Sequence, residues 1–294
     1  MRWRRIKDSL ATKSMTGAVA LANFLVFLLA LGLFMKARPI LVRESMLRLL
    51  FSSSWHPLKG DFGFYPFILG TLAVTAMAMI LAIPVCLLSA IYLSEYAHRR
   101  LREFVRPLID ILAGIPSVIY GFWGVIVIVP LVRVLGQAMG TPTTGYSLLA
   151  GGIILAIMVF PIIISVSTEV LQTVPVEARE TSLGLGATKW ETAKHVVLRS
   201  ARGGILAAIV LGFARAFGET MAVLMVVGNV PKVPTSLFEP AYPLPALIAN
   251  NYGEMMSIPL YDSALMLAAL ILLLVVAGFN LLAHLILLRI GRGS

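Results

Sequence analysis

The chain has 294 residues, of which 59% are hydrophobic and 13% charged, and its mean hydropathy is +0.92. Soluble domains carry about a quarter charged residues, so this composition excludes a soluble globular protein. The formal net charge of +10 does not indicate nucleic-acid binding, because the basic residues fall between apolar segments and not along one face. The single cysteine, Cys86, excludes a disulfide framework and a cysteine-rich metal site.

Apolar segments recur along the chain at a length that suits a lipid bilayer, which takes about 20 residues to cross. They are found at residues 17–35, 66–92, 107–132, 147–171, 205–228 and 263–288. The sequence therefore predicts an all-α membrane protein, a polytopic bundle of about six transmembrane helices in contact with lipid. The first segment is longer than the apolar part of a signal peptide and lacks a small-residue cleavage site, so we expect it to be retained.

The loops between these segments predict the topology. Together the two tails and the second and fourth loops hold sixteen Lys and Arg, against seven in the other loops, five of which lie in the first loop. This excess places both termini in the cytoplasm. Residues 1–65 would then hold a cytoplasmic tail, the first helix and an external loop. Residues 66–288 would form a five-helix core with a cytoplasmic loop at 172–204, and residues 289–294 a cytoplasmic tail.

The fourth loop has a pattern of its own. Pro175 with the acids that follow it predicts a helix start, Gly184 and Gly186 predict a turn, and Thr188 with Glu191 predicts a capping box. A helix, a turn and a second helix are too polar to cross a membrane. We expect this segment to present a short helix to a partner, the alternative being a solvated connector.

This loop resembles the EAA motif in the membrane subunits of ABC importers, which reads acidic-Ala-Ala, three residues, Gly, nine residues, Ile-x-Leu-Pro. The matching residues are Glu180, Thr181 and Ser182 at the first three positions, Gly186 at the glycine, and Val196 and Leu198 at the apolar pair. Arg199 stands where proline is usual, and Thr181 and Ser182 replace alanines. The resemblance implies the type I importer permease fold (MetI-like) and a loop that docks into a cleft of a separate ATPase subunit.

Two other segments resemble the permeases of phosphate-specific importers. Their residue sequences resemble the C-type (PstC) subunit more than the A-type (PstA) subunit. They are residues 114–124, which end in Tyr120-Gly121-Phe122-Trp123-Gly124, and residues 218–223, Gly218-Glu219-Thr220-Met221-Ala222-Val223. The resemblance implies import of inorganic phosphate across the inner membrane. The implied partners are a PstA-like permease, a PstB-like ATPase dimer and a PstS-like external phosphate-binding protein. No cofactor is implied for this chain, since ATP and Mg²⁺ belong to the ATPase.

Arg215 and Glu219 are charges inside an apolar segment. In a helix that starts near Gly204, Arg215 would lie about 16 Å along the axis, close to mid-bilayer. A charge there costs roughly 2.5–3.5 kcal/mol, so neither side chain should face lipid. Their i,i+4 spacing predicts that they share a face and can pair.

We expect Arg215 to offer phosphate a planar guanidinium fork in the substrate pathway, and Glu219 to keep that binding weak enough for turnover. The resemblance also links these two positions to translocation. The alternative is a structural ion pair that holds helices together.

The sequence lacks the G-x-x-x-x-G-K-[ST] phosphate loop of ATPases. We therefore expect a transport subunit without ATPase activity, driven by another polypeptide. Three alternatives remain: a permease for another oxyanion such as molybdate, tungstate or sulfate, a secondary transporter with Glu219 as proton carrier, and a membrane enzyme. No nucleophile and base with suitable spacing favours an enzyme, and the four histidines have no metal-ligand spacing.

Overall fold

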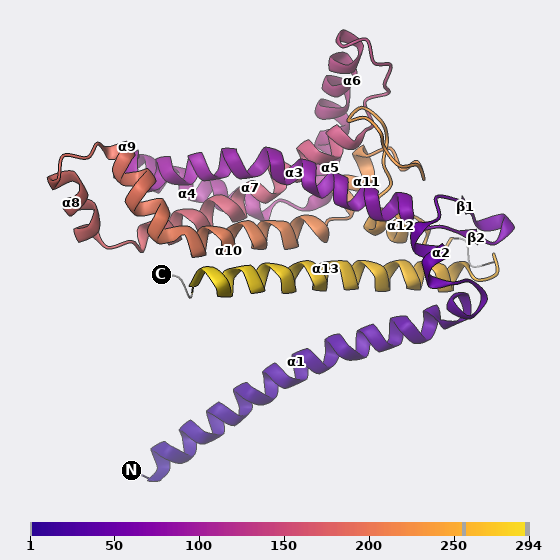
Figure 1. The fold of residues 1–294 in the computed structure, drawn as a ribbon, viewed down its shortest axis with the longest axis horizontal. Helices are drawn as coiled ribbons and strands as arrows, with labels where there is room; N and C mark the ends of the chain where they lie inside the picture. Colours follow the sequence, from indigo (N-terminus) through magenta and orange to yellow (C-terminus); the bar gives the residue numbers. More distant parts are fainter. Residues whose placement is uncertain (1, 255–256, 292–294) are drawn as a thin grey trace.

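The computed structural model describes residues 2–254 and 257–291. Long helices lie side by side along one axis, and short elements close the two ends (Figure 1). The helices are α1 (Arg2–Arg43), α2 (Met46–Phe51), α3 (Tyr65–Ile91), α4 (Arg99–Gly114), α5 (Ser117–Trp123), α6 (Val129–Ala138), α7 (Leu148–Gln172), α8 (Val176–Gly184), α9 (Lys189–Glu191), α10 (Leu198–Phe217), α11 (Met221–Val226), α12 (Leu244–Asn251) and α13 (Tyr261–Gly291).

Four short helical segments and one hairpin complete the described part of the chain. The π-helical turns η2 (Tyr92–Tyr96), η3 (Gly124–Ile128) and η4 (Thr192–Val197) each continue a neighbouring α-helix, and η1 (Pro57–Lys59) is a 3₁₀ turn. Strands β1 (Trp55–His56) and β2 (Asp61–Phe62) pair antiparallel with Trp55 opposite Phe62. The Trp55 ring packs edge-on against Phe67 at 4.8 Å, which anchors this hairpin to the start of α3.

Six helices among the described residues are long and apolar enough to cross a membrane, which confirms the predicted number. They are Leu10–Arg43, Tyr65–Tyr96, Ser117–Ala138, Leu148–Gln172, Lys189–Phe217 and Tyr261–Arg289. In the bilayer every backbone N–H and C=O needs a partner within the protein, and a helix supplies it internally.

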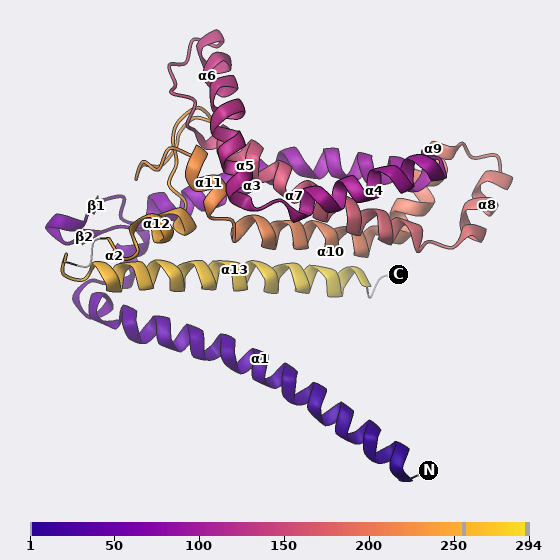
Figure 2. The ribbon, with the colours of Figure 1, turned by 180° about the vertical axis from the view of Figure 1, so that it is seen from behind.

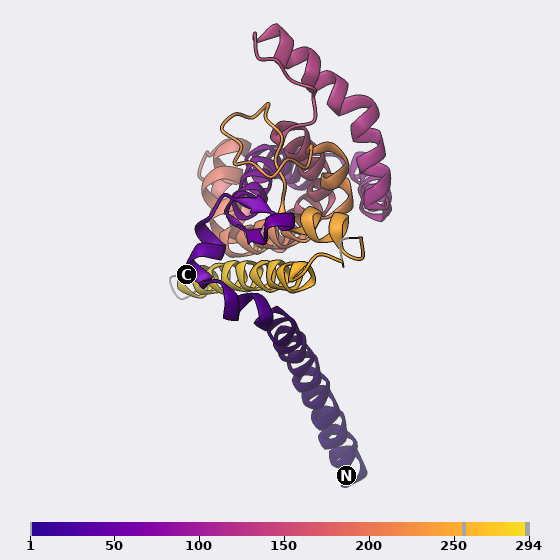
Figure 3. The same ribbon diagram turned by 90° about the vertical axis from the view of Figure 1, so that its right-hand side faces the viewer.

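The two ends of the bundle differ. The β1–β2 hairpin and α2 lie at one end, and α8 and α9 at the other (Figures 1 and 2). The first turn of α1 and the last turn of α13 both point toward the end with α8 and α9. The described ends of α1 and α13 therefore lie on the side of the fourth loop, and the cytoplasmic placement of that side stays a prediction. Seen along the bundle, α1 and α6 project away from it in opposite directions (Figure 3).

The first helix is longer than predicted. It was expected at 17–35, but α1 runs to Arg43, so Lys36 and Arg38 belong to the helix and not to an external loop. Pro39 is accommodated inside α1, and the chain leaves the helix only before Ser45, which caps α2 by accepting the Arg48 N–H at 3.3 Å. A single proline removes one donor and does not have to end a helix.

The prediction of one helix over 107–132 is wrong. The chain breaks at Ile115 and Pro116, because a residue before proline is driven out of the α region, and Ile115 has φ −67° and ψ 127°. The amphipathic α4 therefore ends at Gly114, and the apolar span is α5, η3 and α6. The Tyr120 hydroxyl donates to the Leu112 carbonyl at 2.8 Å and joins the two sides of the break.

Helix α7 is the centre of the bundle and packs against α3 and α10. It coincides within a residue with the predicted segment at 147–171. Its contacts with α10 are close because α10 has glycines there: a Cβ at Gly204 would lie 2.3 Å from the Val170 side chain, and one at Gly212 2.6 Å from Ile163. Small residues at such contacts let helix backbones approach within a membrane.

Two neighbouring glycines test this contact. A Cβ at Gly203 would meet nothing within 4 Å, whereas one at Gly204 would overlap Val170. We expect Gly204→Ala to lower stability by about 1–3 kcal/mol and Gly203→Ala to raise it by about 0.5–1 kcal/mol, since alanine is the better helix former. The apparent melting temperature in detergent measures both variants, and equal shifts would contradict the packing described here.

Candidate functional site

The polar loop is shorter than predicted. The sequence predicts this loop over 172–204 and a new helix over 205–228, but a single helical rod of 29 residues runs from Lys189 to Phe217. This rod comprises α9, η4 and α10. Arg199, which replaces the usual proline, keeps its backbone N–H and leaves the helix unbroken. Residues 173–188 remain, and we call them the coupling loop.

The turn of the coupling loop is built as the sequence predicts. Gly186 has φ +90° and its N–H donates to the Leu183 carbonyl at 3.0 Å, so it closes α8 in a conformation that favours glycine. The predicted capping box is present. The Glu191 carboxylate accepts the Thr188 N–H at 2.8 Å, and the Thr188 hydroxyl accepts the Glu191 N–H at 3.2 Å.

The residues matched to the EAA motif fall into two groups. Glu180, Thr181 and Gly186 are exposed on the coupling loop, whereas Ser182, Val196 and Leu198 are half-buried. The Ser182 and Thr192 hydroxyls lie 2.9 Å apart and tie α8 to η4. Leu198 packs against the buried cluster around Val197. The first group can contact a partner, while the second fixes the loop to the rod.

The tip of the coupling loop and the first turn of the rod also expose apolar side chains. Leu185 is 85% exposed, and Leu183 and Trp190 are 43% and 48% exposed. They belong to α8, the turn after it and α9, at one end of the bundle (Figure 1), and the charged residues Glu180 and Lys189 are close to them in the sequence. Apolar residues exposed together next to charges are typical of a protein-binding surface.

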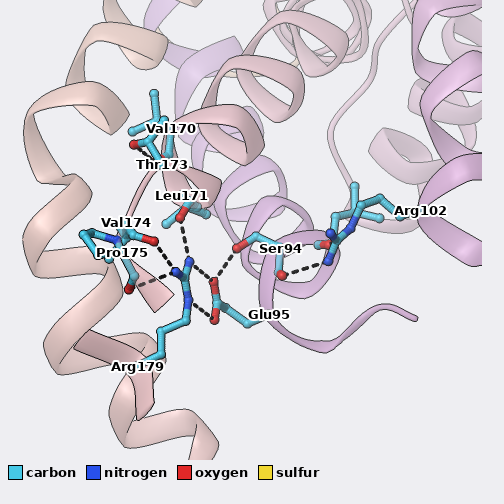
Figure 4. A network of polar contacts seen from close by, with 10 residues as sticks. Ser94, Glu95, Arg102, Val170, Leu171, Thr173, Val174, Pro175 and Arg179 are labelled. Carbon is cyan, nitrogen blue, oxygen red and sulfur yellow. Dashed lines mark hydrogen bonds and ion pairs between the residues drawn. The ribbon is translucent and has the colours of Figure 1, made fainter. Parts of the chain in front are cut away.

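An ion pair that sequence analysis missed holds α8 in place. The Arg179 guanidinium donates from Nε and Nη2 to the two carboxylate oxygens of Glu95 at 3.1 and 3.0 Å. The Arg179 and Glu95 side chains are only 18% and 13% exposed. Glu95 lies in η2, 84 positions earlier, so no local pattern could have joined the two residues. Figure 4 shows the pair where α8, η2 and the end of α7 meet.

The predicted pairing of Arg215 with Glu219 is wrong. Helix α10 ends at Phe217 and Gly218 caps it, so the two residues do not share a helical face. Glu219 is half-buried, and its Oε1 accepts the Ala222 N–H at 3.2 Å at the start of α11. Within the described part of the chain Arg215 makes no ion pair or hydrogen bond, and its guanidinium lies within electrostatic range of Tyr120.

Arg215 lies beside the middle of the bundle. The rings of Phe213 and Phe217, on either side of it, pack on Phe279 at centroid distances of 4.3 and 5.5 Å. Phe279 is near the midpoint of α13, which runs the length of the bundle (Figure 1). The site therefore holds an exposed, unpaired cation at mid-height, at the end of a helical rod that starts in the coupling loop.

A polar cavity of about 340 Å³ lies between α4 and α7. It is lined by Leu93, Arg102, Arg106, Ile109, Asp110, Ser165, Thr168, Glu169 and Gln172. Arg106 faces Glu169 across it at 3.6 Å, and the Thr168 hydroxyl has no partner among the described residues. No three His, Cys, Asp or Glu side chains gather as a metal site would require in the part of the chain that the structure describes.

The fold is the type I, MetI-like fold of ABC importer permeases. Residues 82–292 match the family described as "Binding-protein-dependent transport system inner membrane component". Solved structures agree in fold. A chain of the inward-facing MetNI methionine ABC transporter superposes with TM-score 0.58 at 21% identity, over 75% of this chain and 93% of that one. A chain of a bacterial alginate ABC transporter reaches TM-score 0.61 at 16% identity, over 96% and 95%.

Similar proteins of known name include permeases of phosphate transport systems. The chain is 36% identical to the phosphate transport system permease protein PstC of Xylella fastidiosa, over 95% of this chain and 90% of that protein. It is 33% identical to a probable PstC of Methanocaldococcus jannaschii, over 88% and 87%. A probable ABC transporter permease, YqgH of Bacillus subtilis, is 40% identical over 71% and 67%. The chain belongs to the binding-protein-dependent transport system inner-membrane component family, as a transport subunit that spans the membrane.

The geometry of the turn generates a prediction. Gly186 needs φ +90°, whereas Gly184 lies in α8 with ordinary helical geometry, and a Cβ at either position would meet nothing within 4 Å. Gly186→Ala should cost about 1–2 kcal/mol from the backbone alone, and Gly184→Ala should cost nothing. Amide hydrogen exchange across residues 183–191 should therefore accelerate only in Gly186→Ala, and acceleration in both variants would contradict this structure of the turn.

Proposed function

We propose that this chain is a permease subunit of an ATP-driven importer that moves inorganic phosphate into the cytoplasm. Similarity to proteins named PstC over most of both chains is the main reason to propose phosphate as the substrate. The exposed, unpaired Arg215 beside the middle of the bundle supports it, because phosphate binds best to a planar cation with several donors.

In this proposal the rod from Lys189 to Phe217 connects the ATPase subunit, docked at the coupling loop, to the substrate pathway. Its first turn follows the coupling loop, and its last turn carries Arg215. When the ATPase closes on ATP and moves the loop, the rod shifts Arg215, and the pathway opens to one side of the membrane at a time. Glu219, in the break after the rod, opposes the anion and limits how long phosphate stays.

The proposal includes a set of partners. The Arg215 face would meet a second, PstA-like permease, and the exposed tip around Leu185 would dock on a PstB-like ATPase dimer that holds ATP and Mg²⁺. A PstS-like binding protein would deliver phosphate at the end with the β1–β2 hairpin. Both termini would lie in the cytoplasm, because both helix ends point toward the coupling loop.

Permeases for molybdate, tungstate or sulfate remain the rival interpretation, since a guanidinium suits several oxyanions. Reconstitution with candidate partner subunits in liposomes decides between them. We expect ATP-dependent uptake of labelled phosphate that excess molybdate or sulfate does not suppress. Uptake driven by a proton gradient without any ATPase would favour the secondary-transporter alternative and overturn the proposal.

Two conservative variants test the roles of the charges. Arg215→Lys keeps the charge but loses the fork, and should lower uptake by about tenfold or more. Glu219→Gln keeps an oxygen for the Ala222 N–H, so α11 stays capped while the negative charge is removed. We expect Glu219→Gln complexes to assemble normally and to bind phosphate more tightly, with a lower KM and slower turnover. Loss of assembly in Glu219→Gln would instead indicate a structural role.

A further inference from the structure

The Arg179–Glu95 pair is less exposed to solvent than the other ion pairs of the described residues. In each of the others at least one side chain is more than 60% exposed, whereas Arg179 and Glu95 are 18% and 13% exposed. Exposed pairs contribute little because water screens them. A shielded, two-point contact between a guanidinium and a carboxylate holds its partners in a defined orientation.

Arg179 also reaches the end of α7. Its Nη2 donates to the Leu171 carbonyl at 2.8 Å, and its Nη1 donates to the carbonyls of Val174 and Pro175. These carbonyls lie at and just beyond the C-terminus of α7, where helix carbonyls lack partners and a cation is favoured. One side chain of α8 thus binds α7 and η2 at once (Figure 4).

Glu95 is itself held from a second direction. The Ser94 hydroxyl donates to Glu95 Oε1 at 2.6 Å, and Arg102 of α4 donates to the carbonyls of Leu93 and Ser94 at 2.9 Å each. The π-helical turn η2 directly continues α3. The network therefore joins α8 to α3 and α7, with α4 as a further support.

Apolar packing near this connection comes from Val174, which precedes α8 and is buried in a cluster with Ala90, Ile91 and Leu171. Helix α8 itself adds nothing to that cluster. Helix α8 has no buried residue, and among the described residues its other side-chain hydrogen bond to a different element is the Ser182–Thr192 pair, which leads to the rod. Without Arg179, α8 would remain attached to the rod but would lose its polar attachment to α3 and α7.

We propose that Arg179 and Glu95 form the joint that transmits movement of the coupling loop to α3 and α7, in parallel with the direct route through the rod. Arg179 is thus a positioning residue that acts through Glu95 and the α7 carbonyls. This inference rests on the proposed function, because it assumes that an ATPase moves the loop. If the joint holds, α3 and α7 move together with the coupling loop. Helix α10 then does not slide along an α7 that stays in place.

Substitutions at the pair separate transmission from stability. Removing one partner leaves a shielded charge alone and destabilises the protein, whereas replacing both by apolar residues of similar size is often neutral. We expect Glu95→Gln and Arg179→Met to lower the melting temperature. The double variant Glu95→Leu/Arg179→Met should recover it in part, because the carbonyls of Leu171, Val174 and Pro175 still lack the Arg179 donors. If the pair transmits movement, uptake stays at least about tenfold low in the double variant, because the apolar contact lacks the two-point geometry.

The assay uses the assembled complex in liposomes and records phosphate uptake, ATP hydrolysis and co-purification of the ATPase. Arg99→Gln is the matched control, since the Arg99–Glu103 pair on the same side is 90% and 62% exposed. We expect hydrolysis and assembly to persist in the double variant while uptake is lost, and the control to behave as wild type. Recovery of uptake together with stability in the double variant would overturn the inference.

A distance measurement keeps the test independent of the substrate. Spin labels at Glu177 in α8 and Leu88 in α3, both exposed, are placed in a Cys86→Ala background. On binding a non-hydrolysable ATP analogue, the label distance should stay constant in the protein with the native pair and change in the double variant. A constant distance in both would overturn the inference. A wild-type complex that fails to take up phosphate, yet shows this contrast, would refute the proposed substrate and leave the joint supported.

Discussion

Inside a bilayer a backbone N–H or C=O has no water to bind, and this constraint applies at the two places where the described chain interrupts its spanning segments near Pro116 and Phe217. Where the chain breaks at Pro116, the Tyr120 hydroxyl binds the Leu112 carbonyl. Where it breaks after Phe217, Glu219 accepts the Ala222 N–H. At each of these two breaks a side chain binds one of the backbone groups that the interruption leaves without a helical partner.

The second break sets the geometry of the candidate pathway. Glu219 Oε1 accepts the Ala222 N–H after the break, and no ion pair joins Glu219 to Arg215 in the described part of the chain, so the guanidinium stays unpaired there. An isolated cation facing lipid would be costly. Its position therefore favours a face that is covered by protein or lined by water in the assembled transporter.

The coupling loop and the Arg215 region are mechanically continuous. The rod from Lys189 to Phe217 links them directly, and the Arg179–Glu95 pair links the loop to α3 and α7. Close glycine contacts at Gly204 and Gly212 lock the rod against α7. Interfaces packed this tightly shift as units and do not deform continuously. This behaviour suits a transporter in which movement of the coupling loop opens the substrate pathway to one side of the membrane.

The sequence by itself determined the class of fold, the number of spans, the turn at Gly186, the capping box at Thr188 and the family, because these depend on local composition, spacing and motif. Contacts between residues far apart in the chain could not be predicted from the sequence. The Arg179–Glu95 contact crosses 84 positions. The continuity of the rod past Arg199 and the separation of Arg215 from Glu219 were decided by tertiary structure, since local periodicity does not reveal where packing extends one helix and ends another.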